Sequence, residues 1–161
     1  SPKWNASSGA DRYRRSIYTF IKRTAPFAMY ATFDAPSGEA CIAQRTRSNS
    51  PLQALTLLND VMVMDLARAA SVRFSSASAV PLAEQLEKMF RAVLVRPPTT
   101  DELHLLESFF AEQRQVFIDN PASAKELVAA DGKGSQDLAS QAAWVATARA
   151  LFALDETQNR E

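Results

Sequence analysis

The sequence predicts an all-α fold in which about five or six helices pack around a central buried helix at about residues 51–74. Three observations favour this class. Apolar residues form 47% of the 161 residues and glycine contributes only 4, which is more typical of a packed helical protein than of a turn-rich β-sandwich or a disordered chain. Apolar side chains recur at spacings of three and four from residue 51 onward. Prolines and capping signals separate these periodic segments, and the length suits one domain over residues 1–161.

The N-terminal third has the weakest periodicity. We expect residues 1–11 to be extended or disordered. Residues 12–23, "RYRRSIYTFIKR", place apolar side chains at helical spacing and predict a helix, although Tyr18 and Phe20 also favour a strand. Residues 24–50 contain two prolines and a glycine without a sustained period, which predicts a long ordered loop region.

The segment expected to be the central helix begins at a clear capping signal. Ser50 offers a capping hydroxyl, and Pro51 follows at the first helical position, where its missing N–H costs nothing. Other faces of this segment are apolar as well, which indicates burial on several sides. The main stripe consists of Leu52, Leu55, Leu58, Met62, Leu66 and Ala69.

Prolines and capping residues predict the next two helices. A second helix is expected from Pro81 to Arg96, before a Pro-Pro step that stops it. Thr99 and Glu102 stand three residues apart, as in a capping box, and open a third helix that ends at Asn120.

The C-terminal part is expected to add two more helices. Ser123 and Glu126 repeat the capping-box spacing and predict the start of a short helix. A final helix is expected over residues 138–154, where alanine, tryptophan and leucine define a wide apolar face.

Charge is balanced overall but unevenly distributed. Residues 1–47 carry eight Lys/Arg against three Asp/Glu, and residues 48–161 carry ten against fifteen. Either the basic segment docks on the acidic remainder of the chain, or its arginines form a surface for an anionic polymer. A nucleic-acid partner is disfavoured because the pI of about 6.6 lies far below the value above about 9 typical of such domains. No apolar run approaches the roughly 18 residues of a membrane span.

The stretch from residue 32 to residue 60 contains the most chemically varied side chains. Cys41 is the single cysteine, so it forms no intrachain disulfide. A catalytic thiol needs a neighbouring base, and the sole histidine, His104, is distant in the sequence. We therefore expect a buried, inert Cys41 and a surface-exposed His104. The candidate functional or structural cluster comprises Asp34, Cys41, Arg45, Arg47, Asn59 and Asp60.

The carboxylates of this stretch have an architectural explanation and a functional one. In the first, Arg45 or Arg47 pairs with Asp60 or Asp65, so that residues 32–50 clamp the central helix, because an unpaired buried charge is costly. In the second, Asp34 and the arginines line a site. No phosphate loop, nucleophile elbow or metal-binding motif occurs, and we expect no metal or cofactor in this fragment.

Several strings together resemble a known family. They are "YRRSIYTFIKRTAP", "TFDAP", "EACIAQRTRSNSPLQALTLLND", "RPPTTDEL" and "AAWVATARALFALDE", spread over residues 12–156. This order resembles the C-terminal domain of unknown function (PSD-type domain) of planctomycete cytochrome c-associated proteins. The resemblance implies the C-terminal portion of a larger domain, in an exported bacterial protein located in the periplasm or cell envelope, with haem c elsewhere in the parent chain.

The resemblance supplies no catalytic residues to transfer. The expected function is therefore a non-catalytic structural or interaction domain that packs against other domains of the parent chain or against a protein partner. The alternative is part of a hydrolase-like or polysaccharide-active unit whose site is completed by segments outside this fragment.

Overall fold

The computed structural model describes residues 5, 7–22, 25–36, 38, 41–44, 48–75, 80–128 and 137–158. All regular elements among these residues are helices, which confirms the all-α prediction. The chain divides into two compact units, Ser1–Thr56 and Leu57–Glu161. A single domain over residues 1–161 stays a prediction. In the described part of the chain, no helix is both long enough and apolar enough to cross a membrane.

The first unit contains short helical pieces. The helix predicted over residues 12–23 is wrong, because the chain there forms two 3-10 turns joined by extended residues. None of the residues in these turns is buried, so no core contact compensates the cost of nucleating an α-helix. The loop predicted over residues 24–50 contains one short helix. The elements are η1 (Gly9–Tyr13), η2 (Ser16–Tyr18), α1 (Ala28–Thr32) and the first part of α2 (Pro51–Asn59).

The continuous helix predicted over residues 51–74 is interrupted at Asp60. Helix α2 ends at Asn59, and α3 spans Val61–Ser75. Asp60 begins α3: its Oδ1 accepts the backbone N–H groups of Met62, at 2.8 Å, and Val63, at 3.3 Å. Apolar periodicity does not reveal this cap, because the period continues across it.

The buried face of α3 is also different from the predicted stripe. Leu66 is 42% exposed. Small side chains on the buried face let a neighbouring helix approach closely, whereas the larger leucine remains near solvent. The buried residues of α3 are Val63, Ala67, Ser71 and Ser75.

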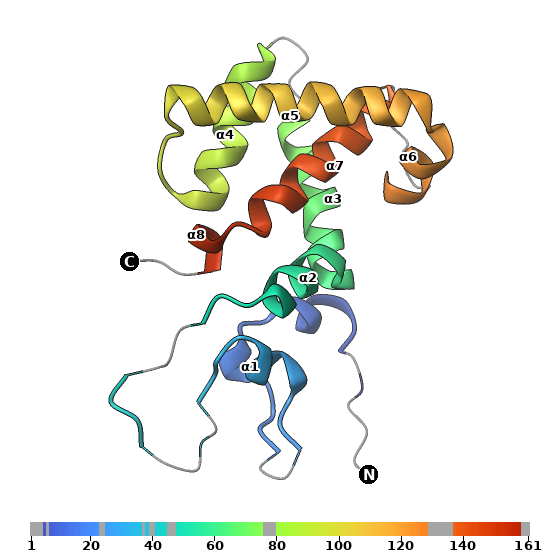
Figure 1. Cartoon of the computed structure of the whole chain (residues 1–161). Coiled ribbons are helices and arrows are strands. Elements are labelled where there is room, and N and C mark those ends of the chain that lie inside the picture. The colour runs from blue at the N-terminus through green and yellow to red at the C-terminus, as the bar shows by residue number, and fades with distance from the viewer. Residues whose placement is uncertain are drawn as a thin grey trace. The chain divides into compact units, whose positions relative to one another are not determined.

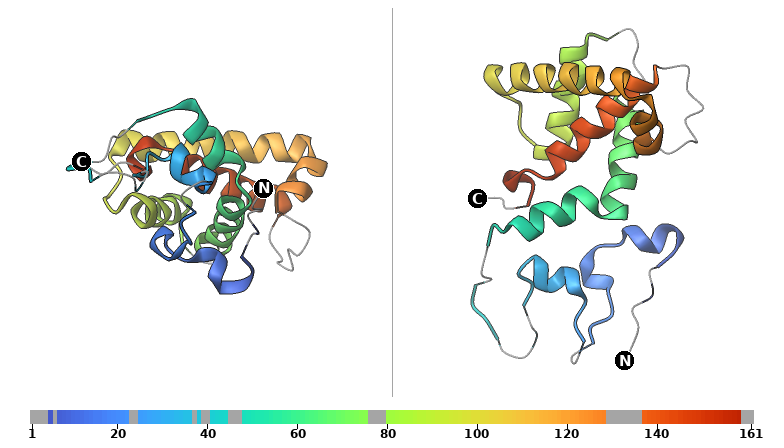
Figure 2. Two further views of the ribbon diagram at one scale, coloured as in Figure 1. Left: turned by 90° about the horizontal axis from the view of Figure 1, so that it is seen from below. Right: turned by 45° about the vertical axis from the view of Figure 1, so that its right-hand side comes forward.

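The central helix of the second unit is α7 (Leu138–Phe152). It contacts α3, α4 (Leu82–Leu94), α5 (Thr100–Asp119) and α6 (Pro121–Val128). Figure 1 and the right-hand view of Figure 2 show α7 crossing below α5, with α3 beside it. The assignment of the central position to residues 51–74 is therefore wrong: the core is built around α7 and its partner α5. The buried residues of α7 are Ala139, Ala142, Ala143, Trp144, Val145, Thr147, Ala148 and Leu151.

The other helices of the second unit follow their predicted signals closely. The Thr99–Glu102 capping box is present at the start of α5. Asn120 ends α5 as predicted, but its Oδ1 also accepts the N–H of Ser123 at 3.2 Å. The Ser123–Glu126 box is therefore wrong as the start of the short helix, because α6 begins at Pro121, directly after Asn120, and Ser123 lies inside its first turn. The elements are α4 (Leu82–Leu94), α5 (Thr100–Asp119), α6 (Pro121–Val128) and α8 (Asp155–Gln158).

Arg96 joins the α4–α5 connection to α8. Its guanidinium donates to both carboxylate oxygens of Glu102, at 2.6 and 2.9 Å, and to both oxygens of Glu156, at 2.6 and 2.7 Å. It also lies 4.9 Å from the ring centroid of buried Phe90. Hydrogen bonds, first from Arg96 and second from the Thr99 backbone N–H, lower the pKa of Glu102 from 4.5 to about 2, and the hydrogen bonds from Arg96 also lower the pKa of Glu156.

This arrangement predicts a specific acid sensitivity. A carboxyl group whose pKa is lower in the folded state stabilises the fold above its unfolded pKa, and this contribution disappears as the pH falls through the folded value. We expect the melting temperature to fall as the pH decreases from about 4.5 to about 2, the range set by Glu102. In Arg96→Met, thermal melts over this range should show a smaller pH dependence.

Arg91→Met is the matched control, because it removes only an exposed pair with Glu87 one turn away. It should retain the wild-type acid profile. An Arg96→Met profile that also matches the wild type would show that the network does not cause the acid sensitivity.

Candidate functional site

The region of the predicted cluster is organised around Gln53, a residue that is not a member of that cluster. Gln53 lies in the first turn of α2 and is 2% exposed. Its side-chain Nε2 lies 2.8 Å from the carbonyl of Thr32, 3.2 Å from Oγ of Ser48 and 3.3 Å from Oδ2 of Asp34. One buried amide therefore joins the end of α1, the turn after it and the residues before α2.

Asp34 forms the second centre of this network. Its Oδ2 accepts hydrogen bonds from the backbone N–H of Ser48, at 2.7 Å, and from the Ser48 hydroxyl, at 2.6 Å. The backbone of Asp34 has a φ of 54°, a left-handed conformation that aspartate tolerates better than most residues. These contacts close the intervening loop at its base.

A capping box completes the network at the start of α2. The Ser50 Oγ accepts the N–H of Gln53 at 3.3 Å, and the Gln53 Oε1 accepts the N–H of Ser50 at 3.1 Å. The predicted cap at Ser50 is confirmed. The Ser-x-x-Gln spacing was the available signal for Gln53. The Asp34 carboxylate is engaged in holding the loop, and these contacts do not involve the predicted pairing of Arg45 or Arg47 with Asp60 or Asp65.

The remaining members of the predicted cluster lie outside this network. Cys41 is an exposed free thiol, so the expectation of a buried cysteine is wrong. Residues 41–44 belong to no helix and are all exposed, so no core surrounds the sulfur. Asn59 is exposed at the end of α2, and Asp60 caps α3. Arg45 and Arg47 lie outside the described residues, so their pairing stays a prediction.

Two other expectations concern single side chains. Asp65, a predicted partner of the clamp arginines, lies 3.4 Å from the guanidinium of Arg68 on the same helix. His104 is exposed on α5, with its side chain 73% accessible, which confirms the expected surface position. In the part of the chain that the structure describes, no group of three or more His, Cys, Asp or Glu is placed to hold a metal ion.

Residues 13–21 of the first unit present large apolar side chains to solvent. We call them the exposed segment. Monomeric proteins rarely leave several large apolar groups uncovered in one place, and such surfaces commonly bind another protein or a membrane. The exposed side chains and their accessible fractions are Tyr13 51%, Ile17 83%, Tyr18 70%, Phe20 72% and Ile21 69%.

The backbone of the exposed segment is held by specific contacts. The hydroxyl of Tyr30 on α1 donates to the carbonyl of Ser16 at 2.6 Å. The N–H groups of Tyr18 and Thr19 each donate to a carbonyl three residues back, at 3.0 Å. The rings of Phe27 and Tyr30 form an edge-to-face contact, with their centroids 5.8 Å apart. The segment is therefore presented from an ordered support.

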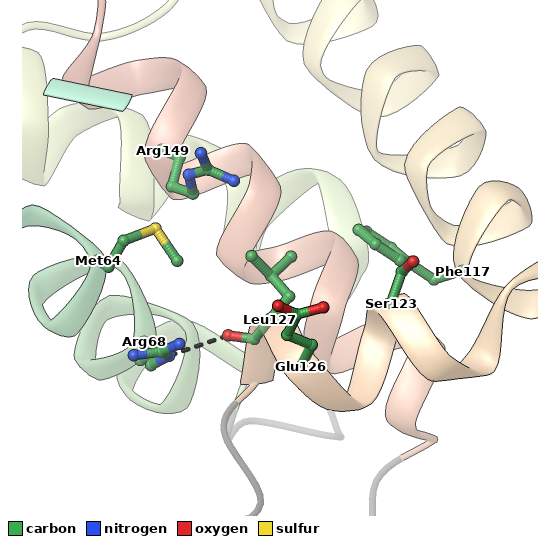
Figure 3. Close-up of a pocket in the computed structure, with 7 residues that line it drawn as sticks. All are labelled: Met64, Arg68, Phe117, Ser123, Glu126, Leu127 and Arg149. Carbon is green, nitrogen blue, oxygen red and sulfur yellow. Dashed lines mark hydrogen bonds between the residues drawn. The ribbon is translucent and has the colours of Figure 1, made fainter. Parts of the chain in front are cut away.

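A pocket of about 340 Å³ lies in the second unit, between α3, α5, α6 and α7 (Figure 3). Arg68 of α3 and Arg149 of α7 provide its cationic groups. The Nε of Arg68 donates to the carbonyl of Leu127 at 2.9 Å, and Nη2 of Arg149 donates to the carbonyl of Leu58 at 2.5 Å. The other lining residues are Met64, Phe117, Ser123, Glu126 and Leu127.

The chain matches a known protein family over most of its length. The model of PSD1, described as a protein of unknown function (DUF1553), matches residues 1–110. The match includes the Gln53 network, the exposed segment and Arg68, whereas Arg149 lies beyond it. The resemblance over residues 111–156 stays a prediction. Neither the curated proteins nor the solved structures contain a match to the chain.

Proposed function

Because the chain belongs to the PSD1 family of proteins of unknown function (DUF1553), we propose a function from the surface of the chain itself. We propose that it is a non-catalytic helical domain that docks onto another part of its parent protein. The exposed segment is the observation that carries this proposal. Burying five large apolar side chains on association would be favourable, at about 25 cal/mol for each Å² of apolar surface removed from water. The ordered backbone beneath them reduces the entropy that binding has to overcome.

The charge around the exposed segment indicates the character of its partner. Residues 11–22 contain four basic residues, Arg12, Arg14, Arg15 and Lys22, and one acidic residue, Asp11. Arg14 pairs with Asp11 at 2.8 Å and lies 6.0 Å from the ring centroid of Tyr18. The complementary surface is apolar at its centre and acidic at its rim. We assign this surface to another part of the parent protein.

The resemblance to planctomycete cytochrome c-associated proteins supports a wider setting for this role. We propose that the chain is part of an exported bacterial protein, located in the periplasm or cell envelope, that carries haem c in another domain. This chain has one cysteine, so it does not itself contain the two-cysteine motif that attaches haem c. Cell fractionation followed by haem staining tests this setting, and a haem-free cytoplasmic protein would contradict it.

The rival function is a hydrolase-like or polysaccharide-active unit. It would use Asp34 as an acid or base. The hydrogen bonds from Ser48 and Gln53 give Asp34 a structural task, and this favours the interaction domain.

Hydroxyl-radical footprinting tests the docking role directly. The labelling of Tyr18 and Phe20 is compared between this 161-residue chain and the intact parent protein. We expect both side chains to be labelled strongly in the isolated chain and to be protected in the parent. Equal labelling in both proteins would contradict the proposal.

A pair of matched variants assigns the protection to the exposed segment. Ile17→Ser/Phe20→Ser should restore labelling of Tyr18 in the parent without changing the melting temperature of the isolated chain. The control Val116→Ser/Ile118→Ser changes two exposed apolar residues of α5 and should leave the protection intact. A membrane would be the partner instead if two results were found together. The isolated chain would bind anionic vesicles and lose this binding in Ile17→Ser/Phe20→Ser, and Tyr18 would stay unprotected in the parent protein.

A further inference from the structure

The pocket of the second unit contains an arginine whose charge is not compensated by the residues that the structure describes. Arg149 is half-buried, and the Leu58 carbonyl is its one acceptor among them. Its Nε is buried and donates to no described atom. No described carboxylate lies within 4.0 Å of its guanidinium. A buried donor without a partner is costly and calls for a specific explanation.

The second arginine of the pocket leaves part of its guanidinium available. Arg68 uses Nε for the Leu127 carbonyl, and its Nη1 lies 3.4 Å from Asp65, a long distance for an ion pair. Figure 3 shows Arg68 and Arg149 on either side of Met64. Two guanidinium groups around one space match the oxygens of a carboxylate or phosphate, which they bind in a planar, bidentate manner.

The rest of the lining indicates the body of the ligand. Met64, Phe117 and Leu127 contribute apolar surface, and the volume of about 340 Å³ falls in the size range of small-molecule pockets. Ser123 adds a hydroxyl that can donate to an oxyanion. Glu126 also lines the pocket, is exposed, and forms no ion pair with either arginine, so its charge opposes an anionic ligand.

We propose that this pocket binds a small ligand with an oxyanion head and an apolar body, and that Arg149 and Arg68 hold the head. The ligand supplies the counter-charge that Arg149 lacks among the described residues. This binding site is separate from the exposed segment of the first unit and does not depend on the proposed docking function.

Methyl NMR of the 161-residue chain offers a local readout, because Met64 lines the pocket. The chain is labelled with ¹³C at its methionine methyl groups and titrated with octanoate, octyl phosphate, acetate and octanol. We expect the Met64 signal, assigned through Met64→Leu, to shift with octanoate or octyl phosphate, while Met29 and Met89 stay unchanged. The stronger of these two probes identifies the head group. Acetate and octanol should bind at least tenfold more weakly, since each lacks one half of the recognised chemistry.

Charge variants test the role of each group. Arg68→Met and Arg149→Met should each weaken binding of the preferred probe by roughly tenfold or more, whereas Arg73→Met, an exposed change on α3, should not. Glu126→Gln should strengthen binding by up to about fivefold, and Glu112→Gln, an exposed change on α5, should have no effect. Circular dichroism identifies any variant that fails to fold. If Arg149→Met fails to fold, Arg68→Met and Glu126→Gln still test the proposal.

Three results would overturn the proposal. The first is an unchanged Met64 signal at millimolar concentrations of both charged probes. The second is an equal shift with octanol, which would indicate apolar adsorption alone. The third is equal affinity in the arginine variants and in Arg73→Met.

Discussion

Replacing Trp144 by alanine is expected to lower the free energy of unfolding of the second unit by about 3–5 kcal/mol. Trp144 is 4% exposed on α7, and its ring centroid lies 4.9 Å from that of Phe110 on α5. The substitution removes a large apolar side chain and leaves a cavity between the two helices that organise the core. Urea denaturation followed by circular dichroism at 222 nm measures the change.

Leu66→Ala is the informative comparison. Leu66 belongs to the stripe that the sequence predicts to be buried, but it is 42% exposed on α3. Its substitution is expected to change the free energy of unfolding by no more than about 1 kcal/mol, as at other partly exposed surface positions. A larger loss for Leu66→Ala than for Trp144→Ala would restore the central role to residues 51–74 and contradict the packing around α7.

Replacing Gln53 by alanine is expected to destabilise the first unit by about 1–3 kcal/mol. The substitution leaves the Thr32 carbonyl without its amide donor and removes the side-chain acceptor for the Ser50 N–H. It also releases the loop that Asp34 and Ser48 close. Amide hydrogen exchange of Ser48 and Gln53, measured by NMR, should accelerate by roughly 10- to 100-fold.

Gln53→Glu separates the two roles of this side chain. A glutamate retains an acceptor for the Ser50 N–H, but it removes the amide donor and places a second carboxylate near Asp34. Its exchange rates at neutral pH should therefore be at least as fast as those of Gln53→Ala. Gln44→Ala, an exposed change in the same unit, should exchange like the wild type. Wild-type exchange in Gln53→Glu would show that the amide donor does not hold the loop.

Local signals in the sequence determined the helical class and many helix ends. The capping box at Thr99 and Glu102 and the cap at Ser50 involve residues three positions apart. Such contacts form within a single turn, so they can be recognised from spacing alone. The Asn120–Pro121 junction acts equally locally, because proline restricts the residue before it. The helix predicted to end at Arg96 ends two residues earlier, at Leu94, where Val95 adopts a left-handed conformation with a φ of 61°.

Only the tertiary structure decided which helix is central. The leucine-rich stripe of residues 51–74 has the larger side chains, but the buried positions of α3 are Val63, Ala67, Ser71 and Ser75. Helix α7 is rich in alanine, and close approach to its neighbours buries nearly its whole circumference. Side-chain size and period describe one helix at a time, whereas burial depends on which surfaces of several helices fit together.

The candidate site also has features that the sequence identified and features that only the tertiary structure revealed. Asp34 was identified from its residue type, and the Ser50 cap was identified from its hydroxyl and the Pro51 that follows it. The structure alone placed the Gln53 amide against Thr32, Asp34 and Ser48, which lie up to 21 residues away. It also exposed Cys41 and brought Arg68 and Arg149 to one pocket. These features depend on contacts between distant segments, and the free energy of such contacts is determined by packing and desolvation, which no local pattern contains.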